Sequence, residues 1–559
     1  MEATPPTTEG ASATPAVQID HRVRTEILIG ILLALFLSAL DQTIVGTAMP
    51  RILTDLHGID LYTWVVTIYL LTSTITGPIY GKLSDQFGRK NLLIFGVVVF
   101  LVGSALSGLS QDMIQLIVFR GIQGIGAGAI FPIALAVIGD LFTPRERGRY
   151  QGLFGAVFGI SALVGPALGG FLTDSISWHW VFYVNIPIGA VALFIIWRLL
   201  PPLHTAGVTR KIDYLGVAVF TAALVPILIG LTNAQQHDWT DPLVGGLILI
   251  GLALGGLFLW IETRAAEPIV PLGLFRNRTY AISIVATFLA SFGFFGAVLF
   301  LPLWYQVVNG STATESGYQL LPLLGGLIIS SIASGQIVSR SGRYKWLTVG
   351  ALVVLSIGLL LLTNLRAETP PPMLWLWQFV TGLGVGPTFA VFTIIVQNAV
   401  PWNQLGVATS NLTFFRQIGG TVGLSLAWTI FGSTLRTEAP TQVTAQLVNA
   451  GVPQQQITLF TSNFTLSGQQ LNDFGSVGDM GARILAQLPE QARQFVEPLI
   501  GYIVAGIHQA LSIAIANSMW LGVGAALIAV FVAALMPELP LRRDHNPDSA
   551  ALKAAPPTP

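Results

Sequence analysis

The chain has 559 residues, of which 53% are hydrophobic and only 10% are charged, and its formal net charge is zero. Soluble domains carry roughly 25% charged residues, so this composition excludes a string of ordinary soluble domains. It also gives no global field that would attract nucleic acid. The absence of cysteine excludes disulfides and thiolate catalysis, and the seven histidines lack metal-ligand spacing, so we expect no metal site.

Runs of about 20 apolar residues, the length that crosses a bilayer, recur between two polar tails. We expect residues 1–26 and 538–559 to be disordered cytoplasmic tails, because they are polar and rich in Pro. The hydropathy pattern between them predicts fourteen membrane-spanning helices. These spans are expected near residues 27–49, 62–81, 91–110, 113–139, 150–173, 181–200, 214–233, 243–262, 281–305, 318–338, 346–365, 373–397, 406–432 and 513–536.

An even number of spans puts both tails on one side of the membrane. On this assignment 20 of the 27 Lys and Arg residues lie on the tail side, five lie on the other side and two lie inside spans. Basic residues are enriched in the cytoplasmic loops of membrane proteins. The sequence therefore predicts a multi-pass protein of the plasma or inner membrane with both termini in the cytoplasm.

The connection between the last two spans, residues 433–512, is much longer than the others. It lies outside the cell on this topology, is rich in Gln, Thr and Ser, and contains a stretch from Ala482 to Val496 that could form a helix. Connections beyond about 15 residues are usually functional or disordered. Two interpretations stay open: an extracytoplasmic hairpin or flexible insert, and a lid or docking element for an extracytoplasmic partner.

Two sequence patterns occur twice. Residues 81–90 and 335–344 share a Gly and a later Gly-Arg pair at the same spacing, and Gly-x-Gly-x-Gly occurs at 124–128 and again at 382–386. The offsets, 254 and 258 residues, nearly agree. Parallel halves that hold the cargo between them are an established transporter plan. We therefore predict two six-helix bundles and an inserted helix pair, with boundaries at 27–200, 201–265 and 266–537.

Three charged residues lie deep inside predicted spans, where a charge costs at least about 2.5–3.5 kcal/mol and usually marks a pathway or a proton relay. The helical rise puts Asp41 roughly 13 Å and Arg120 roughly 10 Å from the outer face, so we expect them to pair. Burial disfavours an ionised carboxylate and a nearby Arg favours it. Asp41 could therefore exchange a proton during transport, or the pair could be permanently ionised and structural. Arg416 could bind an anionic group or stabilise helix packing.

The short segment after the second span combines glycine with charge. Its Asp85 and Arg89 could form an ion-pair latch that holds one state of a cytoplasmic gate, and Asp140 could join this latch or be a solvated helix end. The residues assigned to this gate are Gly81, Asp85, Gly88, Arg89, Lys90 and Asp140.

The fifth span is rich in glycine around a proline. Small residues four apart allow close helix approach, and proline bends a helix. This span is therefore either a pivot between the halves or an ordinary packing segment. The pivot residues are Gly159, Gly165, Pro166, Gly169 and Gly170.

These motifs resemble the major facilitator superfamily, and within it the fourteen-helix drug:proton antiporters. Residues 40–50 look like the first-helix motif of that branch, and residues 81–90 resemble the superfamily's loop motif. Residues 120–124 resemble the fourth-helix motif, whose Arg the family links to proton transfer. Residues 165–170 look like the exporters' fifth-helix signature, and 180–189 and 416–420 are also similar to this branch.

The resemblance implies an all-α integral membrane protein with the major facilitator fold. It also implies transport driven by a proton gradient without a cofactor. This sequence departs from the pattern at Gly46, where the branch often has Asn, and at Ser339, which replaces the acid of the second loop motif. A latch is therefore expected in one half only.

For function, we expect a proton-coupled exporter of hydrophobic or cationic small molecules, with lipid, protons and cargo as its partners. The alternative is export of a lipid, a siderophore or an endogenous metabolite that uses the long outer loop. A scaffold or an enzyme is the third class, but no nucleotide loop, metal cluster or nucleophile elbow is present. The cavity residues we expect are Tyr69, Gln123, Phe292, Tyr305, Asn411 and Arg416.

Overall fold

The computed structural model describes residues 21–56, 61–142, 144–202, 212–234, 237–453, 481, 485, 493 and 496–541. The described residues form helices and connections without a strand, and 13 helices among them are long and apolar enough to cross a membrane. One more, α2 (Tyr62–Phe87), fills the place of the second predicted span, and its Thr and Ser residues make it less apolar than the others. The predicted all-helical membrane fold is confirmed.

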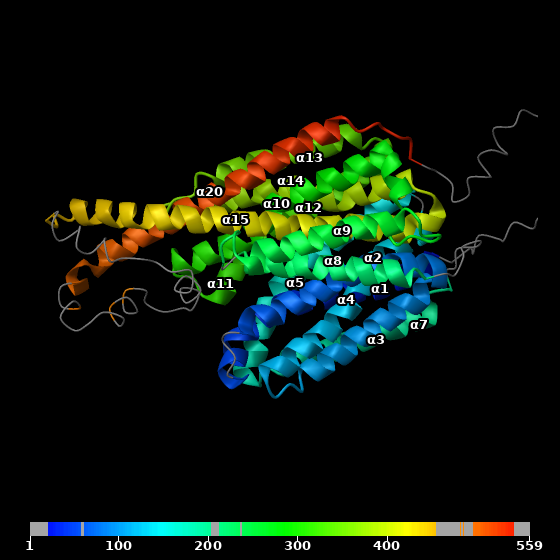
Figure 1. The fold of residues 1–559 in the computed structure, drawn as a ribbon, viewed down its shortest axis with the longest axis horizontal. Helices are drawn as coiled ribbons and strands as arrows, with labels where there is room; N and C mark the ends of the chain where they lie inside the picture. The colour runs from blue at the N-terminus through cyan, green and yellow to red at the C-terminus, as the bar shows by residue number, and fades with distance from the viewer. Residues whose placement is uncertain are drawn as a thin grey trace, which may run out of the picture.

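The helices fall into two bundles and a pair (Figure 1). The first bundle contains α1 (His21–Leu56), α2, α3 (Arg89–Ser107), α4 (Met113–Leu141), α5 (Pro144–Ser175), α6 (Trp180–Tyr183) and α7 (Asn185–Leu199). The second contains α10 (Arg278–Val307), α11 (Ala313–Tyr318), α12 (Leu321–Ser341), α13 (Lys345–Leu362), α14 (Pro371–Ala399), α15 (Leu405–Asn449) and α20 (Ile500–Ala534). Helix α1 begins and α20 ends at the same end of the molecule, which we call the terminal side, and we call the opposite end the distal side.

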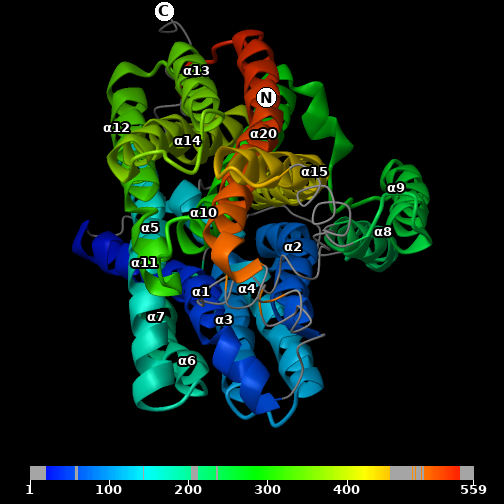
Figure 2. The same ribbon diagram turned by 90° about the vertical axis from the view of Figure 1, so that its left-hand side faces the viewer.

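Helices α8 (Tyr214–Asn233) and α9 (Leu247–Glu262) pack on each other at the edge of the molecule, next to α2 and α15 (Figure 2). Phe220 of α8 lies between Phe258 of α9 and Phe414 of α15, with ring centroids 5.1 and 5.6 Å away. The Ser425 hydroxyl of α15 donates a hydrogen bond to the carbonyl of Leu231, 2.6 Å away. The pair is therefore attached to the second bundle as well as to α2.

The repeated glycines make the same contacts in both bundles. A Cβ on Gly124 or Gly128 would meet the backbone of α2, and a Cβ on Gly382 or Gly386 would meet the backbone of α12. The middle glycines face the other way, Gly126 onto α3 and Gly384 onto α13. Each bundle is thus built around a fourth helix whose glycines let two neighbours approach closely.

Both copies of the repeated loop motif place a glycine at a positive φ. Gly88, between α2 and α3, has φ +96°, and Gly342, between α12 and α13, has φ +71°. Residues with a side chain rarely adopt this region, which explains why glycine recurs at this position of the motif. The turns themselves differ, because ψ is 143° at Gly88 and 2° at Gly342.

Helices α15 and α20 extend further on the distal side than we predicted. The spans expected at 406–432 and 513–536 continue as helix to Asn449 and start at Ile500, so residues 433–449 and 500–512 are not a loop. The position of a Cβ on Gly506 lies 2.6 Å from Val443 Cα, so the two extensions touch. The hairpin interpretation fits these residues, while most of the predicted helix at 482–496 lies outside the described residues.

The first boundary also differs from the prediction. Residues 21–26, which we assigned to a disordered tail, are the first turns of α1. Arg22 and Glu26 form an i,i+4 ion pair there, with Nε and Oε1 3.1 Å apart. These polar turns continue a helix whose apolar part begins at Ile27, so the hydropathy pattern could not locate its start.

We expect Gly126→Ala to lower stability. Its Cβ would lie 2.6 Å from the carbonyl oxygen of Gly96 and 2.7 Å from Phe100 Cα, which are backbone atoms that cannot rotate away. Overpacking of this kind costs about 1–3 kcal/mol. The matched control is Gly524→Ala, at an exposed position of α20. No atom lies within 4 Å of the added Cβ there, and alanine favours the helix by about 1 kcal/mol relative to glycine. Thermal unfolding in detergent should rank control, wild type and Gly126→Ala in that order, and equal midpoints for the last two would contradict the packing argument.

Candidate functional site

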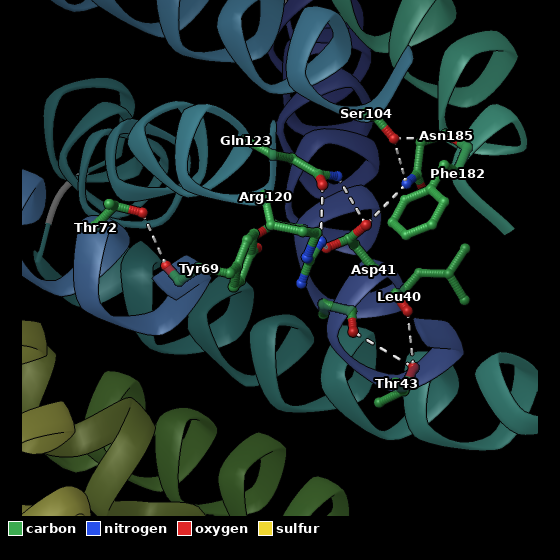
Figure 3. Close-up of polar contacts among 12 residues, drawn as sticks. Leu40, Asp41, Thr43, Tyr69, Thr72, Ser104, Arg120, Gln123, Phe182 and Asn185 are labelled. Carbon is green, nitrogen blue, oxygen red and sulfur yellow. Dashed lines mark hydrogen bonds and ion pairs between the residues drawn. The ribbon is translucent and has the colours of Figure 1, made fainter. Parts of the chain in front are cut away.

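Asp41 lies near the middle of α1 with its side chain wholly buried, and α4 and α7 direct donors at its carboxylate (Figure 3). Arg120 Nη1 donates to Asp41 Oδ2 at 2.5 Å. Gln123 Nε2, one turn along α4, donates to Asp41 Oδ1 at 2.8 Å, and Asn185 Nδ2 donates to the same oxygen at 3.0 Å. The pairing of Asp41 with Arg120 that the depth estimate predicted is present.

Further hydrogen bonds fix these donors in place. Arg120 Nη1 also donates to Gln123 Oε1 at 2.7 Å, and Asn185 Nδ2 also donates to Ser104 Oγ of α3 at 3.0 Å. The Ser104 hydroxyl in turn donates to the carbonyl of Phe182 at 2.9 Å. We call Asp41, Ser104, Arg120, Gln123 and Asn185 the Asp41 cluster.

Two members of the cluster are unexpected. Gln123 was predicted to line the cargo cavity, but it is part of the shell around the carboxylate. Asn185 was not among the predicted site residues, although it lies in the segment 180–189 that resembles the family and is an amide within a largely apolar span. Sequence spacing could not reveal its role, because its partners Asp41 and Ser104 are 144 and 81 residues away in the chain.

Tyr69 of α2 covers the guanidinium of Arg120. Its ring centroid lies 4.2 Å from Arg120 Cζ, and its hydroxyl oxygen lies 3.3 Å from Ser38 Oγ of α1. The Phe182 ring lies 6.0 Å from the same Cζ. A cation over an aromatic face is stabilised more strongly when water is excluded. Tyr69 therefore helps to hold a charged guanidinium in a buried place.

The Asp41 carboxylate is the one acid of the cluster, which otherwise consists of an arginine, two amides and a hydroxyl. Protonation would remove the charge that Arg120 faces and weaken the three hydrogen bonds that join α1 to α4 and α7. A change of charge at Asp41 is therefore also a change in how tightly α1 is held. Among the described residues no His, Asp and Glu side chains gather as a metal site would require.

Helix α5 touches both bundles through the residues of the predicted pivot. Thr43, two residues after Asp41, donates its hydroxyl to the carbonyl of Ser161 of α5 at 3.0 Å. Gly165 and Gly169 face α1, where their Cβ atoms would lie 2.7 Å from Thr43 Cβ and 2.8 Å from the carbonyl oxygen of Ile44.

The other pivot residues face the second bundle. A Cβ on Gly159 would lie against Ile328 of α12, and one on Gly170 would lie 3.8 Å from the Thr314 hydroxyl of α11. Pro166 lies 3.3 Å from the Cβ position of Gly317, next to α11. Helix α5 therefore lies between Asp41's own helix and the opposite bundle, which is the location that a pivot needs.

On the terminal side, Asp85 joins the two bundles. Its Oδ1 and Oδ2 accept hydrogen bonds from the backbone N–H groups of Gly406 and Val407, at 3.0 and 2.9 Å. These are orphan donors in the first turn of α15, where a negative charge is favoured. The sequence suggested an ion-pair latch, and the structure adds that its acid caps a helix of the other bundle.

The remaining gate residues surround Asp85. Arg89 forms ion pairs with Asp85 and with Asp140, whose Oδ2 lies 2.9 Å from Arg89 Nε, and it donates to Ser84 Oγ at 2.6 Å. Gly81 lies against Ser410 and Gly406 of α15, and Gly88 provides the turn. Lys90 is half-buried at the start of α3 and has no ion pair with a described residue.

A second contact closes the same side and was not expected from the sequence. Arg147 of α5 is buried, donates to Gln397 Oε1 of α14 at 3.3 Å, and lies 5.1 Å from the centre of the Trp402 ring. Gln397 Nε2 donates back to the carbonyl of Leu135 in α4 at 3.2 Å. Arg147 had been counted only as one of many basic residues on the tail side.

The four other predicted cavity residues do not form one site. Asn411 Nδ2 donates to Tyr280 Oη at the terminal end of α10, whereas Tyr305 Oη accepts from Gln378 at its distal end. The 25 residues from Tyr280 to Tyr305 correspond to about 37 Å along the helix. Phe292 packs on Gly423 and Phe288, and Arg416 lies over the Phe389 ring.

Comparison with known proteins identifies relatives of this arrangement. The family model described as Major Facilitator Superfamily matches residues 31–424. The chain is 39% identical over 426 residues to the multidrug transporter protein MdtP of Bacillus subtilis, covering 76% of this chain and 78% of the relative. It is 40% identical over 408 residues to multidrug resistance protein 3 of the same organism, covering 73% and 78%. The solved structure of the proton:xylose symporter XylE shares the fold, with a TM-score of 0.57, 13% identity, and coverage of 93% of this chain and 97% of that one.

We expect Asp85→Asn to favour separation of the two bundles on the terminal side. The amide cannot accept two backbone hydrogen bonds through both of its side-chain atoms and does not balance Arg89. Hydrogen bonds to charged groups contribute about 1.5–3 kcal/mol, so the open fraction should rise about tenfold or more.

The distance between the two bundles on the terminal side can be measured by electron–electron double resonance. Because the chain has no cysteine, spin labels can be attached at Asn91→Cys and Asn403→Cys, and both positions are exposed. Asp112→Asn, which removes the carboxylate that caps α4 on the distal side, is the control and should leave the distance distribution unchanged. An unchanged distribution in Asp85→Asn would show that this carboxylate does not hold the gate.

Proposed function

Because the chain belongs to the major facilitator superfamily of membrane transporters, we propose that it is a proton-coupled antiporter that exports hydrophobic or cationic small molecules. The observation that carries the proposal is the Asp41 cluster, a carboxylate wholly buried in a membrane-spanning helix and bound by three donors. A buried charge is costly in a membrane and marks a pathway or a proton relay. The chain is a transporter and not an enzyme, so a catalytic role does not explain this buried charge.

In the proposed coupling step, Asp41 takes up a proton and the hydrogen bonds to its carboxylate weaken. With Asp41 ionised, Arg120, Gln123 and Asn185 hold α1 against α4 and α7. With Asp41 protonated, the charge of Arg120 is no longer balanced, and α1 and the adjacent α5 are freer to move. Thr43 passes this movement to α5 through its hydrogen bond with Ser161. Helix α5 contacts α12, so the position of one bundle depends on the charge in the other.

Alternating access requires the terminal side to open and close. We assign this side to the cytoplasm, because most of the basic residues lie there. The bonds of Asp85 to α15 and of Arg147 to Gln397 close it, and both must break before cargo can enter from the cytoplasm. Cargo leaves on the distal side, and uptake of a proton by Asp41 from that side resets the cycle.

Aromatic side chains of α10 and α14 in the second bundle support a hydrophobic cargo. Phe294 and Phe389 pack edge to face at 5.7 Å, and Phe288 and Phe292 do so at 5.3 Å. Such rings bind flat apolar molecules without specific hydrogen bonds. Two relatives are named a multidrug transporter and a multidrug resistance protein, which supports export of several compounds.

A second candidate function is export of a lipid, a siderophore or an endogenous metabolite. The observation that favours it is the pair of extensions on α15 and α20. The first runs 17 residues beyond the predicted span, about 25 Å. Helices that project beyond the membrane could receive a cargo that does not leave into water.

We expect Asp41→Asn to abolish gradient-driven efflux. Asparagine keeps the shape of the side chain but cannot carry a proton. In cells loaded with ethidium, wild-type efflux should stop when an uncoupler is added, and Asp41→Asn efflux should equal that background with or without uncoupler. Asp238→Asn, an exposed acid between α8 and α9, is the matched control and should behave as wild type. Efflux by Asp41→Asn that still responds to the pH gradient would remove Asp41 as the coupling site.

The two candidate cargoes can be separated by removing the distal hairpin. Val443 and Gly506 touch, so a short Gly-Ser linker can replace residues 444–505 without separating the two helices. If small molecules are the cargo, ethidium efflux should persist in this variant. Loss of dye efflux in a variant that folds and inserts normally would favour the hairpin-dependent function instead.

A further inference from the structure

Arg416 differs from the other buried arginines in the described part of the chain. Arg89 and Arg120 face carboxylates, and Arg147 donates to three oxygens of two backbone carbonyls and a side-chain amide. Arg416 is only 5% exposed, yet it forms no ion pair with a described residue. Its Nη2 donates one hydrogen bond, 3.3 Å long, to the carbonyl of Thr388, and its buried Nε has no hydrogen-bond partner among the described residues.

This arrangement is energetically unfavourable for the protein alone. A buried charge is normally paired and hydrogen-bonded, and leaving it uncompensated costs several kcal/mol. Guanidinium has five N–H donors in a planar fork, of which one is used here. A buried cation without a counter-charge among the described residues points to a partner that is not part of the chain.

The surroundings of Arg416 are aromatic. The Phe389 ring lies under the guanidinium, with its centroid 4.2 Å from Cζ. Phe294 packs edge to face on Phe389, at 5.7 Å, and on Phe295, at 5.4 Å. One turn further on, Gly420 allows this wall to approach α15, since a Cβ there would lie 2.5 Å from the Phe295 ring. The positive group therefore has apolar surface beside it on α10 and α14.

Arg416 also lies on the helix that joins the two bundles. Its α15 begins at the Asp85 latch, and Gly406 and Val407 bind that carboxylate directly. Arg416 follows Val407 by nine residues, which is about 14 Å deeper along the helix. It is thus within the membrane-spanning part of α15, far from the aqueous ends where a cation would find counter-ions.

We propose that Arg416 binds the acidic group of an amphipathic organic acid, with the carboxylate or sulfonate on the guanidinium fork and the apolar body against Phe294, Phe295 and Phe389. Carboxylate, sulfonate and phosphate groups each present two oxygens that can accept parallel hydrogen bonds from a guanidinium, and the Nε of Arg416 has no hydrogen-bond partner among the described residues. This inference rests on the proposed transport function and extends its cargo from cationic and neutral molecules to anionic amphiphiles. A phospholipid phosphate offers the same chemistry and is the second source of such a group.

The test compares two probes with the same ring system. One is 8-anilinonaphthalene-1-sulfonate, and the other is N-phenyl-1-naphthylamine, which lacks the sulfonate. Saturable binding to the purified full chain in detergent is measured after subtraction of empty micelles. In Arg416→Gln the affinity for the sulfonate should fall about 10- to 100-fold, the range expected for lost charged hydrogen bonds, while binding of the amine is unchanged.

Two further variants separate binding from packing. Arg416→Lys keeps the charge but loses the planar fork, so its affinity for the sulfonate should lie between those of wild type and Arg416→Gln. Arg343→Gln, which removes an exposed arginine between α12 and α13, should bind both probes as wild type does. Arg416→Gln should also unfold at the wild-type temperature or above, because it removes an uncompensated buried charge.

The outcomes are distinct. An equal loss of both probes in Arg416→Gln, or no loss of either, would overturn the proposal. Competition by dihexanoyl phosphatidic acid that depends on Arg416 would support it with a lipid as the source of the anion, and sulfonate binding unaffected by that lipid would support it with a soluble acid. Binding in detergent needs no proton gradient, so the result does not depend on whether Asp41 couples transport to protons.

Discussion

The arrangement of the first bundle depends on the hydrogen bonds that compensate one buried carboxylate, that of Asp41. Inside the first bundle, donors from α4 and α7 reach both oxygens of Asp41, and α3 fixes one of those donors through Ser104. The same bonds set how α1 sits against its neighbours. The hydrogen bonds that compensate this buried carboxylate therefore also hold α1 against α4 and α7.

The two bundles share a scaffold but not their charges. Glycines of α4 and α14 pack in the same way, and Gly88 and Gly342 both have a positive φ. The latch acid Asp85 occurs only in the first half, and the corresponding residue in the second half is Ser339. At the second loop a carboxylate comes from the end of the chain instead, since Glu538 accepts a hydrogen bond from the backbone N–H of Tyr344 at 3.0 Å. The repeat supplies close packing, while the charges distinguish the functions of the two halves.

The sequence predicted what depends on hydropathy and helical rise. Hydropathy predicted the spans, and the helical rise predicted the pairing of Asp41 with Arg120. They failed at the ends of two helices. The α15 extension is polar, so hydropathy placed a loop there. The α20 extension is largely apolar, and the prediction missed it by starting the last span at residue 513. Partners such as Asn185 for Asp41, or the α15 N-terminus for Asp85, are set by tertiary packing across 144 and 321 residues. For the same reason Tyr305 and Asn411 were grouped although they lie at opposite ends of the second bundle.

The continuity of α15 has a mechanical consequence. Its 45 residues form one rod of about 68 Å, which starts at the backbone groups that Asp85 caps and ends where it touches α20 on the distal side. A rod of this length amplifies rotation: a tilt of about 10° at its first turn displaces its tip by about 12 Å. Breaking two hydrogen bonds at one surface of the membrane can therefore reposition structure at the opposite surface, without any chain of small side-chain adjustments in between.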